Sequence, residues 1–166
     1  MSTSLKISPC LWFDDRAEDA ARFYVSVFAD SSIDDIAHYS SEGFEVHGHP
    51  EGKVMTVKFT LGGQPFLALN GGPQFTFSEA ISFQVFCDTQ DEVDHYWNAL
   101  TDGGEEGQCG WLKDRFGLSW QVVPNRVAIW LGDHKSGGAE RVTRAFMQMK
   151  KLDIATLERA FTGEAV

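Results

Sequence analysis

The sequence predicts an α+β chain made of two β-α-β-β-β modules followed by a helical tail. Residues 12–15 and residues 86–89 each end a predicted strand, and a glutamate and then an aromatic residue follow both at the same spacing. A glycine-containing turn also recurs, at Gly62-Gly63 in the first half and at Phe116-Gly117 in the second. Such repetition indicates two copies of one supersecondary unit. Beyond Pro124 the strand pattern gives way to a helical one.

The first module begins with a predicted strand over residues 7–13 and a helix over residues 16–28. Asp15 and Glu18 have capping-box spacing, so we expect their side chains to bind the first free amides of this helix. The apolar residues within it recur at helical spacing, which predicts one buried stripe. The members of that stripe are Ala20, Phe23, Val27 and Phe28.

Three more strands complete the first module. They are predicted over residues 32–39, 53–61 and 64–70, and the last two are joined by Gly62-Gly63 as a tight hairpin. The intervening residues 40–52 are polar and rich in turn formers, which predicts a loop.

A linker over residues 71–77 leads into the second module, which repeats this order. A strand over residues 81–87 precedes a helix over residues 90–101, and Thr89 with Glu92 forms a second capping box. Shorter strands follow this helix, which is expected to end at a pair of glycines, Gly103-Gly104.

The hairpin that ends the second module is predicted from residues 110–113 and 118–123, which flank a turn at residues 115–117. Alternation along the second strand separates an apolar face from a mixed face that carries Ser119 and Gln121. The charged residues before the turn, Lys113, Asp114 and Arg115, are expected to be solvated or paired with each other.

The C-terminal segment, residues 125–166, is predicted to be a helical extension. Apolar residues recur at helical spacing over residues 139–150. Asp153 is the expected N-cap of a last short helix, and Leu152 and Leu157 have hydrophobic-staple spacing around it. The extension is expected to pack either on its own domain or on a partner chain.

Composition limits the partners and the compartment. The chain has 166 residues and a formal net charge of −10, which repels phosphate backbones and anionic lipid, so neither nucleic acid nor a membrane is an expected partner. No segment approaches the ~20 apolar residues that span a bilayer. The three cysteines, Cys10, Cys87 and Cys109, are widely spaced among apolar neighbours, which predicts mostly buried, reduced thiols in a cytoplasmic protein.

Neutral polar side chains are the main candidates for ligand binding. Ser82 and Gln84 share one face of a predicted strand, and Ser119 and Gln121 share one face of another. His38 ends a strand, where its imidazole is suited to acid–base work. The predicted ligand-binding residues are Ser82, Gln84, Ser119, Gln121, Asn70 and His38. No catalytic residue is singled out, and His47 and His49 are interpreted as residues of the polar loop.

Five segments together resemble the vicinal-oxygen-chelate (glyoxalase/bleomycin-resistance/dioxygenase) superfamily and, within it, its PhnB-like branch, whose members often bear the label 3-demethylubiquinone-9 3-methyltransferase. They are LWFDDRAEDAARFYVSVF, LGGQPFLALNGGPQF, EAISFQVFCDTQDEVDHYW, CGWLKDRFGLSWQVVP and RVTRAFMQMKKLDIATLERAF. The resemblance implies that residues 5–71 and 78–124 are the two modules of a single domain, residues 1–124, whose curled sheets form a cupped cavity. It also implies a homodimer.

Metal-using members of the superfamily line that cup with His and Glu ligands. The resemblance places the corresponding positions near Pro9, among residues 67–69, at Ser82 and at Gln121, and none of them offers a carboxylate or an imidazole. We therefore expect no metal and no cofactor, and a cup that binds a small molecule. The alternatives are a metal-dependent lyase, isomerase or dioxygenase and a metal-free enzyme; methyl transfer is not expected, since the chain lacks a glycine-rich nucleotide-binding βα unit.

Overall fold

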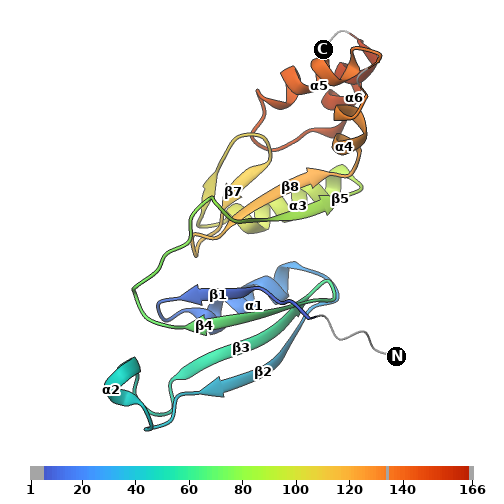
Figure 1. Cartoon of the computed structure of the whole chain (residues 1–166). Helices are drawn as coiled ribbons and strands as arrows, with labels where there is room; N and C mark the ends of the chain where they lie inside the picture. The colour runs from blue at the N-terminus through green and yellow to red at the C-terminus, as the bar shows by residue number, and fades with distance from the viewer. Residues whose placement is uncertain (1–5, 134, 165–166) are drawn as a thin grey trace. The chain divides into compact units, whose positions relative to one another are not determined.

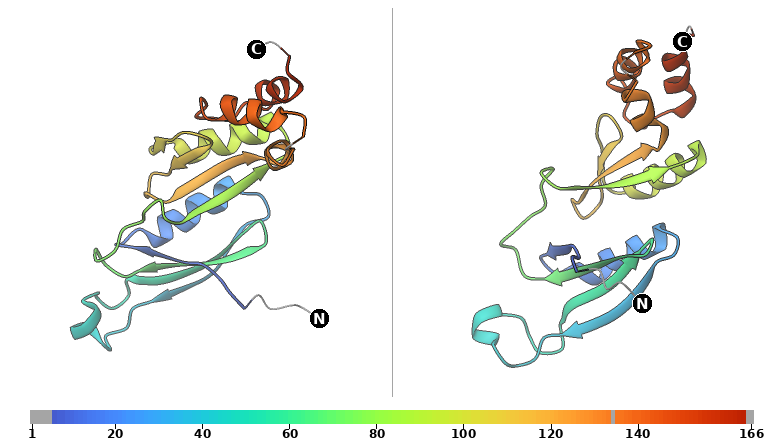
Figure 2. Two further views of the ribbon diagram at one scale, coloured as in Figure 1. Left: turned by 45° about the horizontal axis from the view of Figure 1, so that its top comes forward. Right: turned by 45° about the vertical axis from the view of Figure 1, so that its right-hand side comes forward.

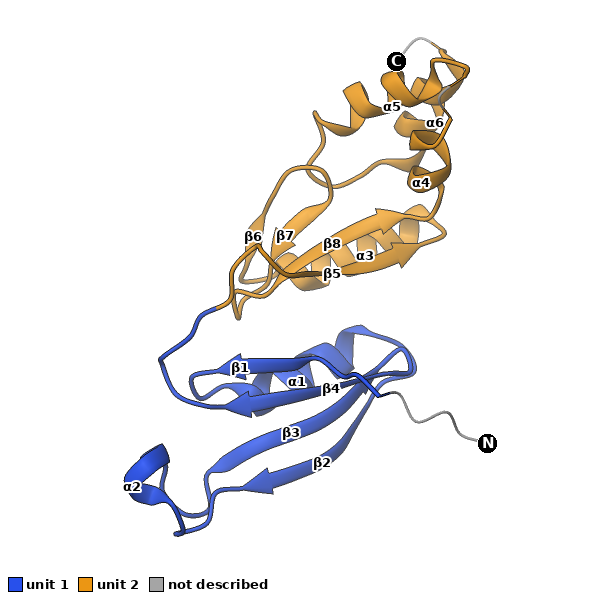
Figure 3. Cartoon of the chain, viewed as in Figure 1, with its two compact units in different colours: residues 1–76 blue, residues 77–166 orange. Residues whose placement is uncertain are grey.

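Two compact units make up the chain, residues 1–76 and residues 77–166 (Figures 1 and 3). The computed structural model describes residues 6–133 and 135–164. Each unit holds a four-stranded mixed sheet with a helix against it. This arrangement confirms the predicted α+β class and the repeated β-α-β-β-β order.

Unit 1 follows the predicted order with one addition. Its elements are β1 (Cys10–Phe13), α1 (Ala17–Val27), β2 (Ser32–His38), α2 (Phe44–His47), β3 (Val54–Leu61) and β4 (Gln64–Asn70). The sheet order is β1-β4-β3-β2, with β1 parallel to β4 and the other pairs antiparallel. The short helix α2 lies inside the segment predicted to be a loop, and β1 begins three residues later than predicted.

The cap of α1 differs from the prediction. Arg16 occupies the N-cap position, and no side chain of the helix's own N-terminus binds its free amides. The amide of Ala17 instead donates to Oδ1 of Asn70, at the end of β4, over 2.8 Å. Glu18 binds Arg22 one turn along the helix. The predicted capping box of Asp15 and Glu18 is therefore wrong, because an acceptor from a neighbouring strand already fills its place.

The core of unit 1 lies between α1 and one face of the sheet. The α1 side chains at its centre are Ala17, Ala20, Ala21, Tyr24 and Val27. Phe23 and Phe28, which the predicted stripe included, are only half-buried, whereas Tyr24 is fully buried and stacks at 6.3 Å on Phe59 of β3. The predicted stripe thus missed Tyr24, an aromatic residue with a polar hydroxyl, together with Ala17 and Ala21.

Unit 2 repeats the architecture and adds the helical tail. Its elements are β5 (Ser82–Cys87), α3 (Gln90–Thr101), β6 (Glu105–Glu106), β7 (Trp111–Lys113), β8 (Ser119–Pro124), α4 (Arg126–Leu131), α5 (Gly138–Phe146) and α6 (Ile154–Thr162). The sheet order is β5-β8-β7-β6, with β5 parallel to β8. The capping box of Thr89 and Glu92 is present at the start of α3, as predicted.

Asp114 organises the hairpin between β7 and β8. Its side chain is 3% exposed and accepts hydrogen bonds from the amides of Phe116 and Leu118 and from Nε1 of Trp120. Lys113 pairs with Glu79 instead, and Arg115 pairs with Asp102. The expectation that the three charged residues are solvated or pair with one another is therefore wrong, because the turn places free N–H groups around the Asp114 carboxylate.

The C-terminal tail, residues 125–166, packs on the rest of unit 2, and backbone hydrogen bonds join the two. The amides of Cys109 and Gly110 donate to the carbonyls of Met149 and Lys150. Gly110 has φ +80°, and a Cβ there would stand 2.7 Å from the carbonyl oxygen of Val122, so this close approach requires glycine.

Helices α4, α5 and α6 lie together at the C-terminal end of the chain (Figure 2), and a small apolar core lies among them. The buried members of this core are Val127, Trp130, Val142, Leu152 and Leu157. Asp153 caps α6 through the amide of Thr156, as predicted. Helix α4 was not predicted, and α5 ends at Phe146, four residues before the predicted end.

Only one of the three cysteines is buried. Cys87 is 1% exposed, Cys109 is half-buried and Cys10 is exposed, so the prediction of mostly buried thiols is wrong. Burial raises the pKa of Cys87 to about 12, and the nearby Glu92 and Asp88 carboxylates add to the effect, so this thiol is a poor nucleophile at neutral pH. No helix among the residues that the structure describes is both long and apolar enough to cross a membrane.

Candidate functional site

The sheet of unit 2 has one face against α3 and one face without a helix, which we call the open face (Figure 3). Residues paired across neighbouring strands point to the same face. The pairings therefore define two rows of side chains across the open face. One row is Glu105, Lys113, Ser119 and Ser82; the next is Trp111, Gln121 and Gln84.

Three side chains of the open face form a hydrogen-bonded chain. Nε2 of Gln84 donates to Oε1 of Gln121 over 3.3 Å, and Nε2 of Gln121 donates to Oγ of Ser82 over 2.8 Å. A glutamine side chain offers two donor hydrogens and two acceptor lone pairs, so each amide in this chain can still form further hydrogen bonds. Gln84 is exposed and Gln121 half-buried, so the remaining positions face outward.

Ser119 is a further polar residue of this face, and its hydroxyl is not part of the hydrogen-bonded chain. Its side chain is 1% exposed, and its Oγ has no hydrogen-bond partner among the described residues. A buried hydroxyl without a partner costs free energy, so native structures contain few of them. An external donor or acceptor that reached Ser119 would remove that cost.

A pocket of about 170 Å³ opens beside Ser119. Its lining comprises Glu79, Glu105, Glu106, Gly107, Trp111, Leu112, Lys113 and Ser119, and we call it the acidic pocket. Nζ of Lys113 lies 2.5 Å from Oε1 of Glu79. This hydrogen bond lowers the pKa of Glu79 and raises the pKa of Lys113, so both groups are charged at neutral pH.

The structure thus brings together four of the six predicted ligand-binding residues: Ser82, Gln84, Ser119 and Gln121. Glu105 and Trp111 belong to the same face and were missed. The signal that identifies them is the strand register, which places Glu105 opposite Lys113 and Trp111 opposite Gln121. The pairing of Glu105 depends on a two-residue strand, β6, which is too short to predict from alternation.

Asn70 has a structural role in unit 1. Its side chain is 2% exposed; Oδ1 accepts from the amide of Ala17, and Nδ2 donates to the carbonyl of Val54 over 3.0 Å. Its own carbonyl accepts the hydroxyl of Tyr39. These contacts tie β4 to α1 and to the start of β3, and they engage both polar atoms of the side chain that was predicted to bind a ligand.

His38 also lies in unit 1, exposed at the end of β2 beside a bulge in its pairing with β3. The loop histidines, His47 and His49, pack against Tyr39. Their ring centroids lie 4.6 and 4.5 Å from the centroid of the Tyr39 ring. Nδ1 of His47 accepts the amide of His49. Within residues 6–133 and 135–164, no three His, Cys, Asp or Glu side chains cluster as a metal site would require.

The positions that the family resemblance aligns with metal ligands hold a chemically different set here. Ser82 and Gln121 are hydrogen-bonded to each other, and residues 67–69 are Leu, Ala and Leu. Stable zinc, iron and manganese sites use imidazole, thiolate or carboxylate donors. The side chains at these positions therefore do not fit the divalent ion of the metal-using members.

Comparison with known proteins places this architecture in a family. The model of the 3-demethylubiquinone-9 3-methyltransferase family matches residues 5–123, which end before α4. The structure of a Bacillus cereus protein described as a putative 3-demethylubiquinone-9 3-methyltransferase, PhnB protein, is 34% identical, covering 72% of this chain and 99% of that one with a TM-score of 0.64. Among curated proteins the comparison finds no match.

Two further solved structures are similar in fold. A protein from Pseudomonas aeruginosa is 22% identical over 73% of this chain and 98% of its own, with a TM-score of 0.58. The fosfomycin resistance protein FosX from Mesorhizobium loti is 15% identical over 74% and 91%, with a TM-score of 0.50. The chain therefore belongs to the PhnB-like family of 3-demethylubiquinone-9 3-methyltransferase proteins, and it has the vicinal-oxygen-chelate fold.

Proposed function

We propose that this protein binds a small polar or aromatic molecule on the open face of unit 2, without a metal ion. Ser82, Gln84, Ser119 and Gln121 would supply the hydrogen bonds. The observation that carries the proposal is the chain from Gln84 through Gln121 to Ser82, which lies beside a buried serine hydroxyl without a partner. Small-molecule sites combine a few convergent polar groups with apolar surroundings.

Apolar side chains border these polar groups. Phe86 is 61% exposed and lies opposite Val123 in the register of β5 and β8, two residues beyond Gln84 and Gln121 and therefore in the next row of the same face. Trp111 borders Gln121 on the other side. An aromatic or aliphatic ligand body can therefore rest on Phe86 or Trp111 while its polar group reaches the amides.

Methyl transfer, which the family description names, finds no support in the described residues. A nucleotide-binding methyltransferase of the doubly wound type needs a parallel sheet and a glycine-rich turn between a strand and a helix. Both sheets here are mixed, with only β1–β4 and β5–β8 parallel, and the turns that precede α1 and α3 contain no glycine. The homodimer and the cytoplasmic location expected from the sequence stay predictions.

Native mass spectrometry combined with elemental analysis tests the proposal directly. The protein should be prepared without chelators and without a metal-binding tag. We expect substoichiometric metal and a discrete organic mass that dissociates intact. One divalent ion per chain that resists dialysis would overturn the metal-free assignment and favour a metal-dependent lyase, isomerase or dioxygenase.

Gln121→Ala is expected to weaken binding of benzamide, a neutral polar aromatic probe, about five- to tenfold, since the loss of one hydrogen bond is worth about 1 kcal/mol. Titration followed by ¹H–¹⁵N correlation spectra measures the affinity and locates it. Gln74→Ala removes an exposed glutamine side chain from the linker and is the matched control. Equal affinities for Gln121→Ala and the unmodified protein would count against the assignment.

A further inference from the structure

The acidic pocket carries an imbalance of charge that the proposed function does not use. Three carboxylates line it, those of Glu79, Glu105 and Glu106, against the single ammonium of Lys113. A concave site lined by one sign of charge attracts ligands of the opposite sign. The carboxylates of Glu79 and Glu106 already have cationic partners, so the carboxylate of Glu105 is the one that can bind a cationic ligand.

Glu79 and Glu106 have partners of their own. Glu79 pairs with Lys113 at 2.5 Å. Glu106 accepts from Nε1 of Trp97 and lies 3.4 Å from Nζ of Lys150.

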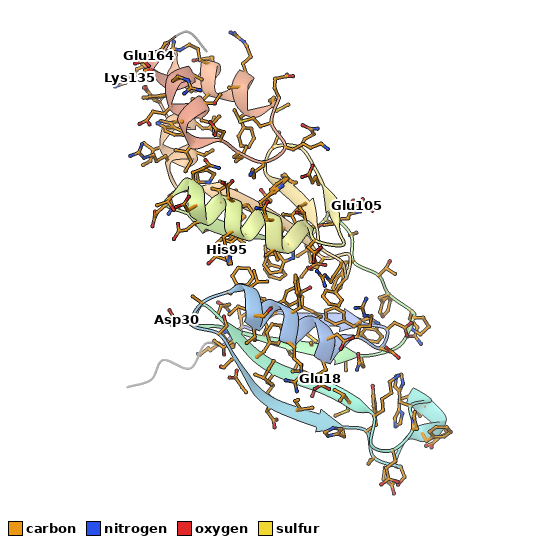
Figure 4. All side chains as sticks on the ribbon, turned by 180° about the vertical axis from the view of Figure 1, so that it is seen from behind. Glu18, Asp30, His95, Glu105, Lys135 and Glu164 are labelled. Atoms are coloured by element: carbon orange, nitrogen blue, oxygen red, sulfur yellow. The ribbon has the colours of Figure 1, made fainter. Side chains whose placement is uncertain are left out.

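Glu105, labelled in Figure 4, is exposed on β6 directly opposite Lys113. Its charge helps to raise the pKa of Lys113, but Glu79 is the closer partner and the larger cause. Glu105 therefore offers a carboxylate to an incoming cation without first giving up an ion pair of its own.

Two further features of the pocket suit an ammonium group. Ser119 contributes an unpartnered Oγ from a side chain that is 1% exposed, and this oxygen can accept an N–H hydrogen bond. Trp111 lines the pocket with a half-buried ring, and tryptophan is the aromatic side chain best suited to cation–π contact. A volume of about 170 Å³ accommodates a head group rather than a whole drug-sized molecule.

We infer that the acidic pocket binds the protonated amine of a small ligand, an inference that rests on the proposed function and names its ligand class. The ammonium donates to the Glu105 carboxylate and to Ser119 Oγ, and the ring of Trp111 contacts its charged end. The body of the ligand then extends along the neighbouring row, from Trp111 towards Gln121 and Gln84.

Three probes that share one aromatic ring test this inference: benzylammonium, benzamide and benzoate. Titration into ¹⁵N-labelled protein, followed through the indole N–H of Trp111 and the amides of β7 and β8, gives their relative affinities. We expect benzylammonium to bind at least about tenfold more tightly than benzoate and more tightly than benzamide. The preference should weaken with added salt.

Variants separate the charge from the hydroxyl. Glu105→Gln should reduce benzylammonium affinity about tenfold and leave benzamide affinity unchanged, whereas Glu51→Gln, an equal charge change at an exposed site in unit 1, should alter neither. Ser119→Ala should weaken benzylammonium binding without lowering the urea midpoint, because it removes a hydroxyl that has no hydrogen-bond partner among the described residues.

The outcomes distinguish this inference from the proposed function. Benzamide binding as tightly as benzylammonium, with shifts at Gln84 and Gln121, would overturn the ammonium assignment and leave the proposed site standing. Unchanged benzylammonium affinity in Glu105→Gln would overturn it too. Shifts at the open face from none of the three probes at millimolar concentration would overturn both.

Discussion

Asp114→Ala is expected to lower the free energy of unfolding by about 4 kcal/mol, because it leaves buried N–H groups without an acceptor. The carboxylate accepts from the amides of Phe116 and Leu118 at 2.8 and 3.1 Å and from the indole of Trp120 at 2.8 Å. All three donors sit on one turn and the strand after it. Urea unfolding followed by tryptophan fluorescence measures the loss.

Two comparisons make this result specific. Asp114→Asn should retain part of the stability, since its remaining oxygen can still accept from the turn amides while its NH₂ faces the Trp120 indole N–H. Asp91→Ala changes the same residue type at an exposed position of α3 and should alter the free energy of unfolding by less than about 1 kcal/mol. A loss below about 1 kcal/mol in Asp114→Ala would contradict the role assigned to the carboxylate.

The hairpin that Asp114 holds is also the part of the sheet that carries the candidate site. Lys113 directly precedes Asp114, and Ser119 begins the strand that follows the turn. By loosening the turn, Asp114→Asn should therefore displace Lys113 and Ser119 and weaken benzylammonium binding. The buried carboxylate in the turn thus holds the chain between two residues of the candidate site, Lys113 and Ser119.

The fold was predictable wherever local chemistry determines it. The Gly62-Gly63 turn holds both glycines at positive φ, and the Thr89 and Glu92 capping box starts α3 where the sequence places it. Both signals involve residues within a few positions of each other, so a single segment contains the whole interaction. The repeat of strands and helices followed from the same kind of signal.

The prediction failed where a distant residue replaces the local one. The Asp15 and Glu18 pair reads as a cap, yet the acceptor comes from Asn70, which is 53 positions from the amide of Ala17. Asp114 is similar, since its neighbours Lys113 and Arg115 suggest solvation, while the fold of the turn buries the carboxylate. Sequence spacing does not encode such contacts, because they form only when the strands are in place.

The candidate site was also predictable only in part, because it depends on how the strands pair. Alternation along β5 and β8 was enough to put Ser82 with Gln84 and Ser119 with Gln121 on one face each. Whether those two faces coincide depends on the parallel register, which pairs Ser82 with Ser119 and Gln84 with Gln121. Glu105 joins the site only through the antiparallel register of β6 and β7.

The two sheets differ in the polarity of their parallel strand pairs. In unit 1, the face of the sheet away from α1 carries Trp12, Leu67 and Leu69, and its strands β1 and β4 pair Cys10 with Leu67. The parallel pair of unit 2 presents Gln84 and Gln121 at the comparable place. Along the parallel strand pairs, amide side chains are thus found in unit 2, where the proposed site lies, and not at the comparable place in unit 1.

Asn70→Ala is expected to lower the free energy of unfolding by about 3 kcal/mol. The substitution removes the acceptor of the Ala17 amide at the start of α1, and caps of this kind are worth about 1 to 2 kcal/mol. It also leaves the carbonyl of Val54 without the donor that now reaches it at 3.0 Å, which adds a further desolvation cost of about 1 kcal/mol or more. Urea unfolding followed by far-ultraviolet circular dichroism measures the sum.

Asn70→Asp separates the two contributions, because a carboxylate still accepts at the helix N-terminus, where negative charge is favourable, but cannot donate to Val54. It should therefore cost less than Asn70→Ala. Asn98→Ala, an exposed position within α3, is the control and should be neutral or slightly stabilising. If Asn70→Ala instead kept its stability and lost benzamide binding, the side chain would be a ligand contact, as the sequence predicted, and the capping role would be wrong.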